Sequence, residues 1–147
     1  MIVDRDSWET PKDLWALLNS QYRFTFDCCA SNDNKKTDRY SDNFEEVRFC
    51  KDNSEILWLN PPFSKAFSMF EHFFFFGDRG VSIYRCDNME TKVWQELILS
   101  KASWIWIPQG RISYKGQKGT GARFPSAIIG YNVALPILAG GTIIKLR

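Results

Sequence analysis

Short apolar runs alternate along this chain with segments whose apolar residues recur at helical spacing. The runs predict strands over residues 24–26, 56–59, 81–84, 104–107, 126–131 and 142–146. The helical spacing predicts helices that begin near residue 10, cover about 65–76, and cover about 90–101. Strands that alternate with helices indicate an α/β layered domain.

Several residues predict where these elements begin and which side they bury. Thr10 reads as a helix N-cap, with Pro11 in the first turn. That helix has one apolar face, made of Leu14, Trp15, Leu17 and Leu18. Ser64 is predicted to cap the second helix, and a weak strand is predicted near residues 47–49. Trp104 and Trp106 alternate with isoleucines, which favours core packing for both rings.

The segment Asn60-Pro61-Pro62-Phe63 directly follows the apolar run 56–59. An amide at the carboxyl end of a strand, beside a proline-stiffened loop and an aromatic ring, suits a flat base with an exocyclic amine. The Asn60 side-chain oxygen and the Pro61 carbonyl can accept the amine hydrogens, while Phe63 stacks on the ring. Pro62 stiffens the loop. The alternative interpretation is an ordinary turn.

The composition narrows the classes of protein that fit. A length of 147 residues suits one domain, residues 1–147, without a separate target-recognition domain. The net charge of +2 permits nucleic-acid binding without requiring it. No membrane span or signal peptide is predicted. Four cysteines without a Cys-x-x-Cys pair, and a single histidine, His72, argue against a metal site. Cys28 and Cys29 suggest reduced thiols in a cytoplasm.

A second candidate site lies at the end of the first predicted strand. Phe26 and Asp27 lead into the small residues of 28–31, which would allow a ligand to approach the backbone closely. A Gly-x-Gly fingerprint does not follow this strand. A polar loop with buried small residues is therefore the competing interpretation.

Several motifs in one order resemble the phage-type, Dam-like DNA N6-adenine methyltransferase family. They are Trp8-Glu9-Thr10-Pro11, Phe26-Asp27-Cys28-Cys29-Ala30-Ser31 with Asn34, Tyr40, Asn60-Pro61-Pro62-Phe63, Thr91-Lys92 with Trp94, Gly110-Arg111-Ile112, and Phe124-Pro125-Ser126. Together they span nearly the whole chain. Arg85 matches the family's turn after the next strand only loosely.

The resemblance implies a compact, single-domain, Rossmann-like methyltransferase fold with three α/β/α layers. It implies S-adenosylmethionine as methyl donor and adenine N6 in DNA as acceptor, with Asn60 to Phe63 as catalytic residues. The donor-binding residues that it implies are Trp8, Thr10, Pro11, Asp27, Cys28, Cys29, Ala30, Ser31 and Asn34. Asp42 or Glu45 is a candidate partner for the donor's ribose or adenine, and a solvated acidic side chain is the alternative for either.

An adenine in a duplex must be flipped out before its amine can reach Asn60. Phosphate contacts have to offset that cost. The candidates are Arg111, Lys115, Lys118 and Arg123, set among glycines, together with Arg85. A flexible hairpin with solvated charges is the alternative for the glycine-rich loop.

The leading hypothesis is therefore a DNA adenine methyltransferase that acts in the cytoplasm of a bacterial or phage-infected cell. One alternative keeps the enzyme class but changes the acceptor to an RNA adenine or a protein glutamine. Another is a degenerate methyltransferase that binds DNA without turnover.

Overall fold

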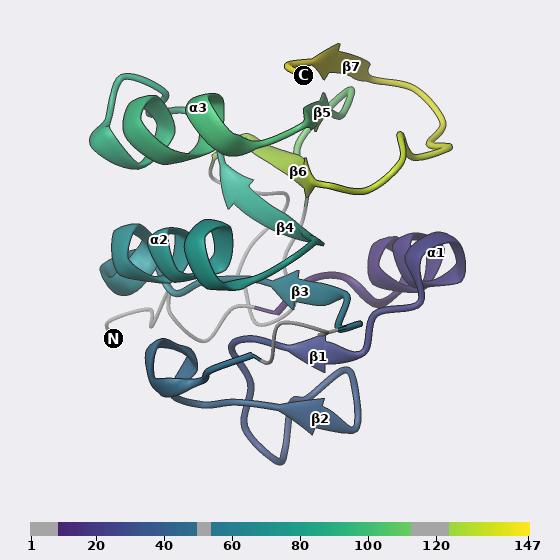
Figure 1. Ribbon diagram of the computed structural model, residues 1–147. Helices are drawn as coiled ribbons and strands as arrows, with labels where there is room; N and C mark the ends of the chain where they lie inside the picture. Colours follow the sequence, from purple (N-terminus) through teal and green to yellow (C-terminus); the bar gives the residue numbers. More distant parts are fainter. Residues whose placement is uncertain (1–8, 50–53, 113–123) are drawn as a thin grey trace, which may run out of the picture.

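The computed structural model describes residues 9–49, 54–112 and 124–147. In this part of the chain seven strands form one sheet, in the order β2-β1-β3-β4-β6-β5-β7 (Figure 1). Their bounds are Phe26–Asp27 (β1), Arg39–Tyr40 (β2), Leu57–Leu59 (β3), Gly80–Arg85 (β4), Trp104–Ile107 (β5), Ser126–Tyr131 (β6) and Thr142–Lys145 (β7). Each of the six strands predicted from apolar runs overlaps an observed strand, whereas β2 was not predicted.

The sheet is mixed, and its parallel part carries the candidate site. Strands β2, β1, β3 and β4 are parallel, whereas β6 runs antiparallel to both β4 and β5, and β7 runs antiparallel to β5. The chain passes from β1 outward to β2 and then returns to place β3 on the other side of β1. Open α/β sheets bind ligands at such a reversal of strand order, outside the carboxyl ends of the strands.

Helices cover both faces of the sheet, so the molecule has three layers (Figure 1). Helix α1, Lys12–Tyr22, packs on one face through Leu18 and the partly buried Leu14 and Trp15. Helix α2, Ala66–Phe76, packs on the other face beside a second helical segment. That segment is π-helical over Val93–Ile98 and ends as α3, Leu99–Lys101. These contacts agree with the predicted α/β layers.

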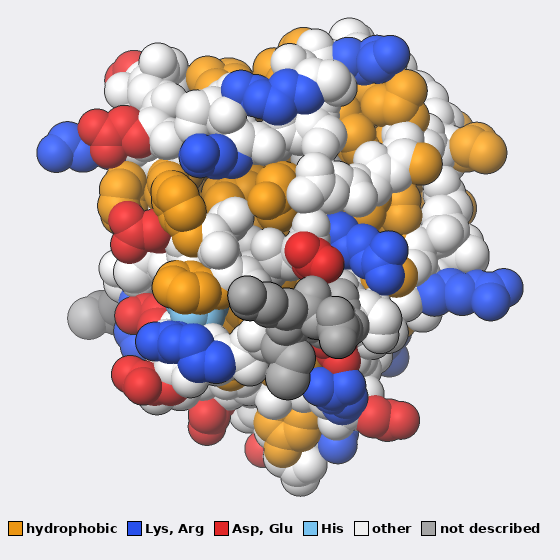
Figure 2. Space-filling view, viewed as in Figure 1, with side chains coloured by type: hydrophobic (Ala, Val, Ile, Leu, Met, Phe, Trp, Pro, Cys, Tyr) orange, Lys and Arg blue, Asp and Glu red, His pale blue; other side chains and the backbone are white. Residues whose placement is uncertain are grey.

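The two tryptophans of β5 are buried in the layer beneath α1. The indole N–H of Trp104 donates to the carbonyl of Val133 at 3.1 Å, and that of Trp106 donates to Gly140 at 3.1 Å. The prediction of core packing is confirmed. Large hydrophobic side chains that remain exposed include Phe67, Phe75 and Phe76 of α2. Figure 2 shows hydrophobic side chains among Lys and Arg on the face of the molecule that carries α2 and α3.

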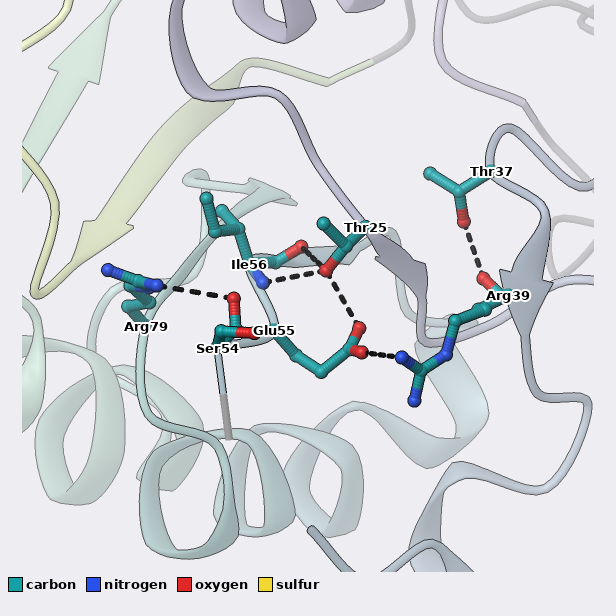
Figure 3. A network of polar contacts seen from close by, with 7 residues as sticks. All are labelled: Thr25, Thr37, Arg39, Ser54, Glu55, Ile56 and Arg79. Atoms are coloured by element: carbon teal, nitrogen blue, oxygen red, sulfur yellow. Dashed lines mark hydrogen bonds and ion pairs between the residues drawn. The ribbon is translucent and has the colours of Figure 1, made fainter. Parts of the chain in front are cut away.

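A polar network ties together the starts of β1, β2 and β3 (Figure 3). The Thr25 hydroxyl donates to Glu55 Oε2 at 2.7 Å and accepts the backbone N–H of Ile56 at 2.9 Å. The other carboxylate oxygen of Glu55 pairs with the guanidinium of Arg39. Glu55 is 5% exposed, so its charge is buried but paired. The network lies opposite the strand ends that carry the candidate site.

Some local predictions were wrong. The N-cap of α1 is Pro11 and that of α2 is Lys65, so neither Thr10 nor Ser64 caps a helix. Leu17 is 46% exposed, because the sheet contacts α1 only along the line of Leu14, Trp15 and Leu18. Residues 47–49 do not form the predicted strand. No helix in the described ranges is long and apolar enough to cross a membrane.

Candidate active site

The carboxyl ends of β1 and β3 open into a pocket with a cavity volume of about 170 Å³. Asp27 ends β1 and Asn60 follows β3, and these neighbouring parallel strands bring both residues to the same edge. The pocket is lined by Glu9, Asp27, Cys29, Ala30, Ser31, Asn34, Lys36, Asp42, Trp58 and Asn60. Residues of the first loop and the first catalytic candidate therefore share one cavity.

Asp27 organises the loop that forms one wall of this pocket. Its carboxylate accepts the backbone N–H of Cys29 at 3.3 Å and that of Lys36 at 3.1 Å. Burial raises the pKa of Asp27 to about 6, and the two N–H donors and the Lys36 charge only partly oppose that shift. The side chain is 3% exposed. An ionised but poorly solvated carboxylate here favours a cationic ligand in the adjoining space.

Hydrogen bonds within the loop hold its small residues in place. Asn34 Oδ1 accepts the backbone N–H of Ser31 at 2.6 Å and is also bonded by the Ser31 hydroxyl. The N–H of Ala30 donates to the carbonyl of Ser41 at 3.0 Å. That bond draws the segment that carries Asp42 against the loop. Five of the predicted loop residues, and Asp42 with them, consequently line the pocket.

Two hydrogen bonds hold Asn60 and the residue before it, one from β4 and one to the segment before α1. Just before Asn60, the buried hydroxyl of Ser82 on β4 donates to the carbonyl of Leu59 at 2.6 Å. The Asn60 side chain donates from Nδ2 to Oγ1 of Thr10 at 3.2 Å. Thr10 is fully buried. The bond links the segment before α1 to the loop after β3, residues fifty positions apart in sequence.

Phe63 lies on the side of the loop away from the pocket described above. It lines a second, open groove together with Ser64, Phe67, Tyr84, Asn88 and Lys92, among others. Its ring makes edge-to-face contacts with Tyr84, at 6.1 Å between centroids, and with Phe124, at 5.2 Å. The segment Asn60 to Phe63 therefore spans the two hollows, with the amide at one and the aromatic ring at the other.

The remaining predicted residues have different positions. Cys28 has no exposed surface and packs in the core on the α2 side. Thr10 and Pro11 do not line the pocket. Thr10 is hydrogen-bonded to the Asn60 side chain, and Pro11 is the N-cap of α1. Arg111 is exposed, and its charge acts on Asp87. Trp8, Lys115, Lys118 and Arg123 lie outside the described residues.

The sequence prediction missed Glu9, Lys36 and Trp58 as lining residues. Glu9 lies within the family-like motif at residues 8–11, and Trp58 lies on the predicted strand before Asn60, so the sequence could have indicated both residues. No sequence pattern indicates Lys36, because it reaches the pocket through the hydrogen bond from its backbone N–H to Asp27. Glu45, the alternative to Asp42, lies elsewhere and accepts a hydrogen bond from Ser68 at 3.1 Å. Within the described ranges no group of acidic, histidine and cysteine side chains is placed to hold a metal ion.

Fold and site together define an α/β protein with a pocket at the point where the order of its parallel strands reverses. The chain belongs to the DNA N-6-adenine-methyltransferase (Dam) family, whose model matches residues 2–126. It is also similar to a DNA N-6-adenine-methyltransferase of Escherichia phage T1, with 32% identity over 77 residues. That match covers 46% of this chain and 32% of the phage T1 protein.

Proposed function

We propose that this protein transfers a methyl group from S-adenosylmethionine to the N6 amine of an adenine in DNA. The observation that carries the proposal is the shared pocket, which joins the Asp27 loop to Asn60 at the carboxyl ends of β1 and β3. Membership of the Dam family supports the same reaction. We further propose that the layered sheet is a Rossmann-like methyltransferase fold.

The chemistry of the pocket fits S-adenosylmethionine. This donor has a positive sulfonium and a positive ammonium group against one carboxylate, and its ribose offers two hydroxyls. The pocket carries the carboxylates of Glu9, Asp27 and Asp42 against the single cation Lys36. Asp42 is suited to accept from ribose hydroxyls, and the Asp27 loop is suited to hold the donor's cationic portion. When bound, the donor supplies an electrophilic methyl group whose sulfur–carbon bond breaks as the nitrogen–carbon bond forms.

Asn60 and Pro61 are proposed to orient the acceptor. The Asn60 amide oxygen and the Pro61 carbonyl each accept one hydrogen of the adenine amine, which turns the nitrogen lone pair toward the pocket. Phe63 stacks on the base, and Pro62 holds the loop in an extended conformation. One amine proton leaves to solvent after the methyl group has transferred. Catalysis then depends on orientation and fixed dipoles instead of a strong base.

DNA is the proposed partner. Flipping the adenine out of its stack costs a few kcal/mol, which contacts with phosphates have to offset. Arg111 is exposed, four residues after the carboxyl end of β5. We propose Arg111, Lys115, Lys118 and Arg123 as phosphate contacts. Such a reaction takes place where DNA is accessible, in the cytoplasm of a bacterial or phage-infected cell.

The test is transfer of labelled methyl from S-adenosylmethionine to unmethylated DNA, with nucleoside analysis of the product. We expect N6-methyldeoxyadenosine from the wild-type protein. Asn60→Ala should reduce turnover by at least a hundredfold while donor affinity, measured by calorimetry, stays within about twofold. Asn43→Ala is the matched control, because Asn43 is an exposed asparagine whose side chain does not line the pocket.

Other outcomes would redirect the proposal. Donor binding without transfer to DNA, but with transfer to RNA or to a protein glutamine, would change the acceptor. Donor and DNA binding without turnover on any acceptor would indicate a degenerate methyltransferase. Absence of donor binding would overturn the methyltransferase proposal itself.

A further inference from the structure

The guanidinium group of Arg85 lies over the ring of Phe63. The Arg85 Cζ atom is 5.1 Å from the centroid of Phe63 and 4.9 Å from that of Phe124. Arg85 is the last residue of β4, so the parallel strands β3 and β4 bring it beside the segment that follows β3. One face of the aromatic ring proposed to stack on the adenine is therefore already covered by a planar cation.

Asp87 holds this guanidinium in a fixed plane. Its two carboxylate oxygens accept from Arg85 Nε and from the second terminal nitrogen of the guanidinium, each at 2.7 Å. The Arg85 hydrogen bonds are the largest cause of the lowered pKa of Asp87. The indole N–H of Trp94 donates to the Arg85 carbonyl at 2.9 Å, which fixes the backbone as well. Only 22% of the Arg85 side chain and 33% of the Asp87 side chain are exposed.

These contacts argue against a simple phosphate contact for Arg85. A bidentate carboxylate partner neutralises its charge and uses the fork of donors that would otherwise grip a phosphate. The two aromatic rings restrict the guanidinium plane further. A side chain that is paired and stacked in this way is suited to hold its neighbours in position.

We propose that Arg85, held by Asp87, is a positioning residue that fixes the Phe63 ring for stacking on the target adenine. This inference rests on the proposed methyltransferase function. The base would stack on the part of the ring that the guanidinium leaves uncovered. Arg85 then acts on the rate through Phe63 and contributes little to the attraction between protein and DNA.

The test compares Arg85→Lys, Arg85→Gln and Asp87→Asn with the wild-type protein. Lysine keeps the charge but lacks the planar fork that binds Asp87 and covers the ring together. We expect kcat to fall about tenfold in all three variants, with KM for S-adenosylmethionine within twofold. The slope of log affinity for DNA against log salt concentration should not change. Arg111→Gln is the control for a phosphate contact, and it should reduce that slope by about one.

A second readout reports on stacking directly. The adenine that the wild-type protein methylates is first mapped, and the same position is then occupied by 2-aminopurine, whose fluorescence is quenched by stacking. In complexes with the Arg85 and Asp87 variants the fluorescence should be higher than with wild type, because the Phe63 ring is no longer held.

Three results would overturn the inference. A salt slope reduced by about one in Arg85→Gln but not in Asp87→Asn would show a phosphate contact. Unchanged or increased kcat in Arg85→Gln would show that the guanidinium packs on the Phe63 ring only when DNA is absent and does not assist stacking of the base. Full activity in Asp87→Asn would show that the ion pair between Arg85 and Asp87 is not needed to position Phe63. If the wild-type protein neither binds the donor nor transfers a methyl group, the result counts against the proposed function and not against this inference.

Discussion

The side-chain amide of Asn60 donates a hydrogen bond to the hydroxyl of Thr10 at 3.2 Å. Because Nδ2 is engaged there, the amide oxygen is directed away from Thr10. In the proposed mechanism, the bond fixes which end of the Asn60 amide faces the adenine amine. Thr10 is completely buried and does not line the pocket beside Asp27, so under the proposed function we expect its loss to affect catalysis more than donor binding.

Thr10→Val keeps the shape of the side chain and removes the hydroxyl. We expect kcat to fall about fivefold, since one orienting hydrogen bond contributes about 1 kcal/mol. The dissociation constant for S-adenosylmethionine should remain within twofold, and Thr10→Ser should restore most of the rate. Steady-state kinetics measures kcat, and calorimetry measures the dissociation constant for the donor. A matching loss of donor affinity in Thr10→Val would show that Thr10 holds the donor, as the resemblance alone implied.

The raised pKa of Asp27 predicts opposite pH dependences for donor binding and stability. As pH falls through about 6, the carboxyl of the folded protein gains a proton that an unfolded chain gains only near 3.8. The cationic donor loses an attractive charge, so its affinity should fall by up to tenfold per pH unit below 6. The folded state binds this proton more tightly than the unfolded chain does. The contribution of Asp27 to the free energy of unfolding should therefore rise over the interval from pH 6 to 4.

Asp27→Asn isolates this effect, because asparagine does not titrate. Calorimetry of donor binding and urea unfolding at several pH values should give flatter profiles for the variant than for wild type in both measurements. Donor affinity in the variant should be lower than wild type at pH 7.5. Parallel profiles for the two proteins would show that another group causes the pH dependence.

The sequence predicted those parts of the fold in which side-chain burial decides the structure. The buried strand β3 shows as an apolar run, and the prolines after it place the Asn60 loop. Strand β2 has two residues, of which Arg39 is exposed, so its pairing with β1 leaves no hydrophobic pattern. The π-helical winding of Val93–Ile98 was also missed, because it buries the same apolar residues as the predicted helix.

The same distinction applies to the site. The pocket residues Asp27 and Asn60 each stand at the end of a predicted strand, and that position could be deduced. The pair of Arg85 with Asp87, by contrast, depends on the turn of the chain after β4 and on the rings of Phe63 and Phe124, from two separate segments. No periodic pattern indicates such a contact. Thr10 reads as a helix cap, and only the three-dimensional structure brings its hydroxyl to Asn60.

The network around Glu55 should contribute to stability without affecting the reaction. Glu55→Ala removes a buried carboxylate that accepts from Thr25 and pairs with Arg39, and we expect a loss of about 1–3 kcal/mol. Arg39→Ala should cost less, about 0–1 kcal/mol, because 66% of the Arg39 side chain is exposed to solvent. Urea unfolding measures both variants. The kcat of each should be unchanged below its unfolding transition, and an equal loss of stability in both would contradict this ranking.

Gly130 should not tolerate a side chain, because the Trp104 indole packs directly on its backbone. These residues face each other across β5 and β6, and a Cβ added at Gly130 would clash with atoms of the Trp104 ring. Gly130→Ala should therefore destabilise the protein by at least about 1–3 kcal/mol, the usual cost of overpacking a core. Trp104→Phe supplies a smaller ring, at the expense of the hydrogen bond to Val133. In a double-mutant cycle followed by urea unfolding, Gly130→Ala should cost less in the Trp104→Phe background than in wild type. If the two losses simply add, the clash lies elsewhere in the sheet.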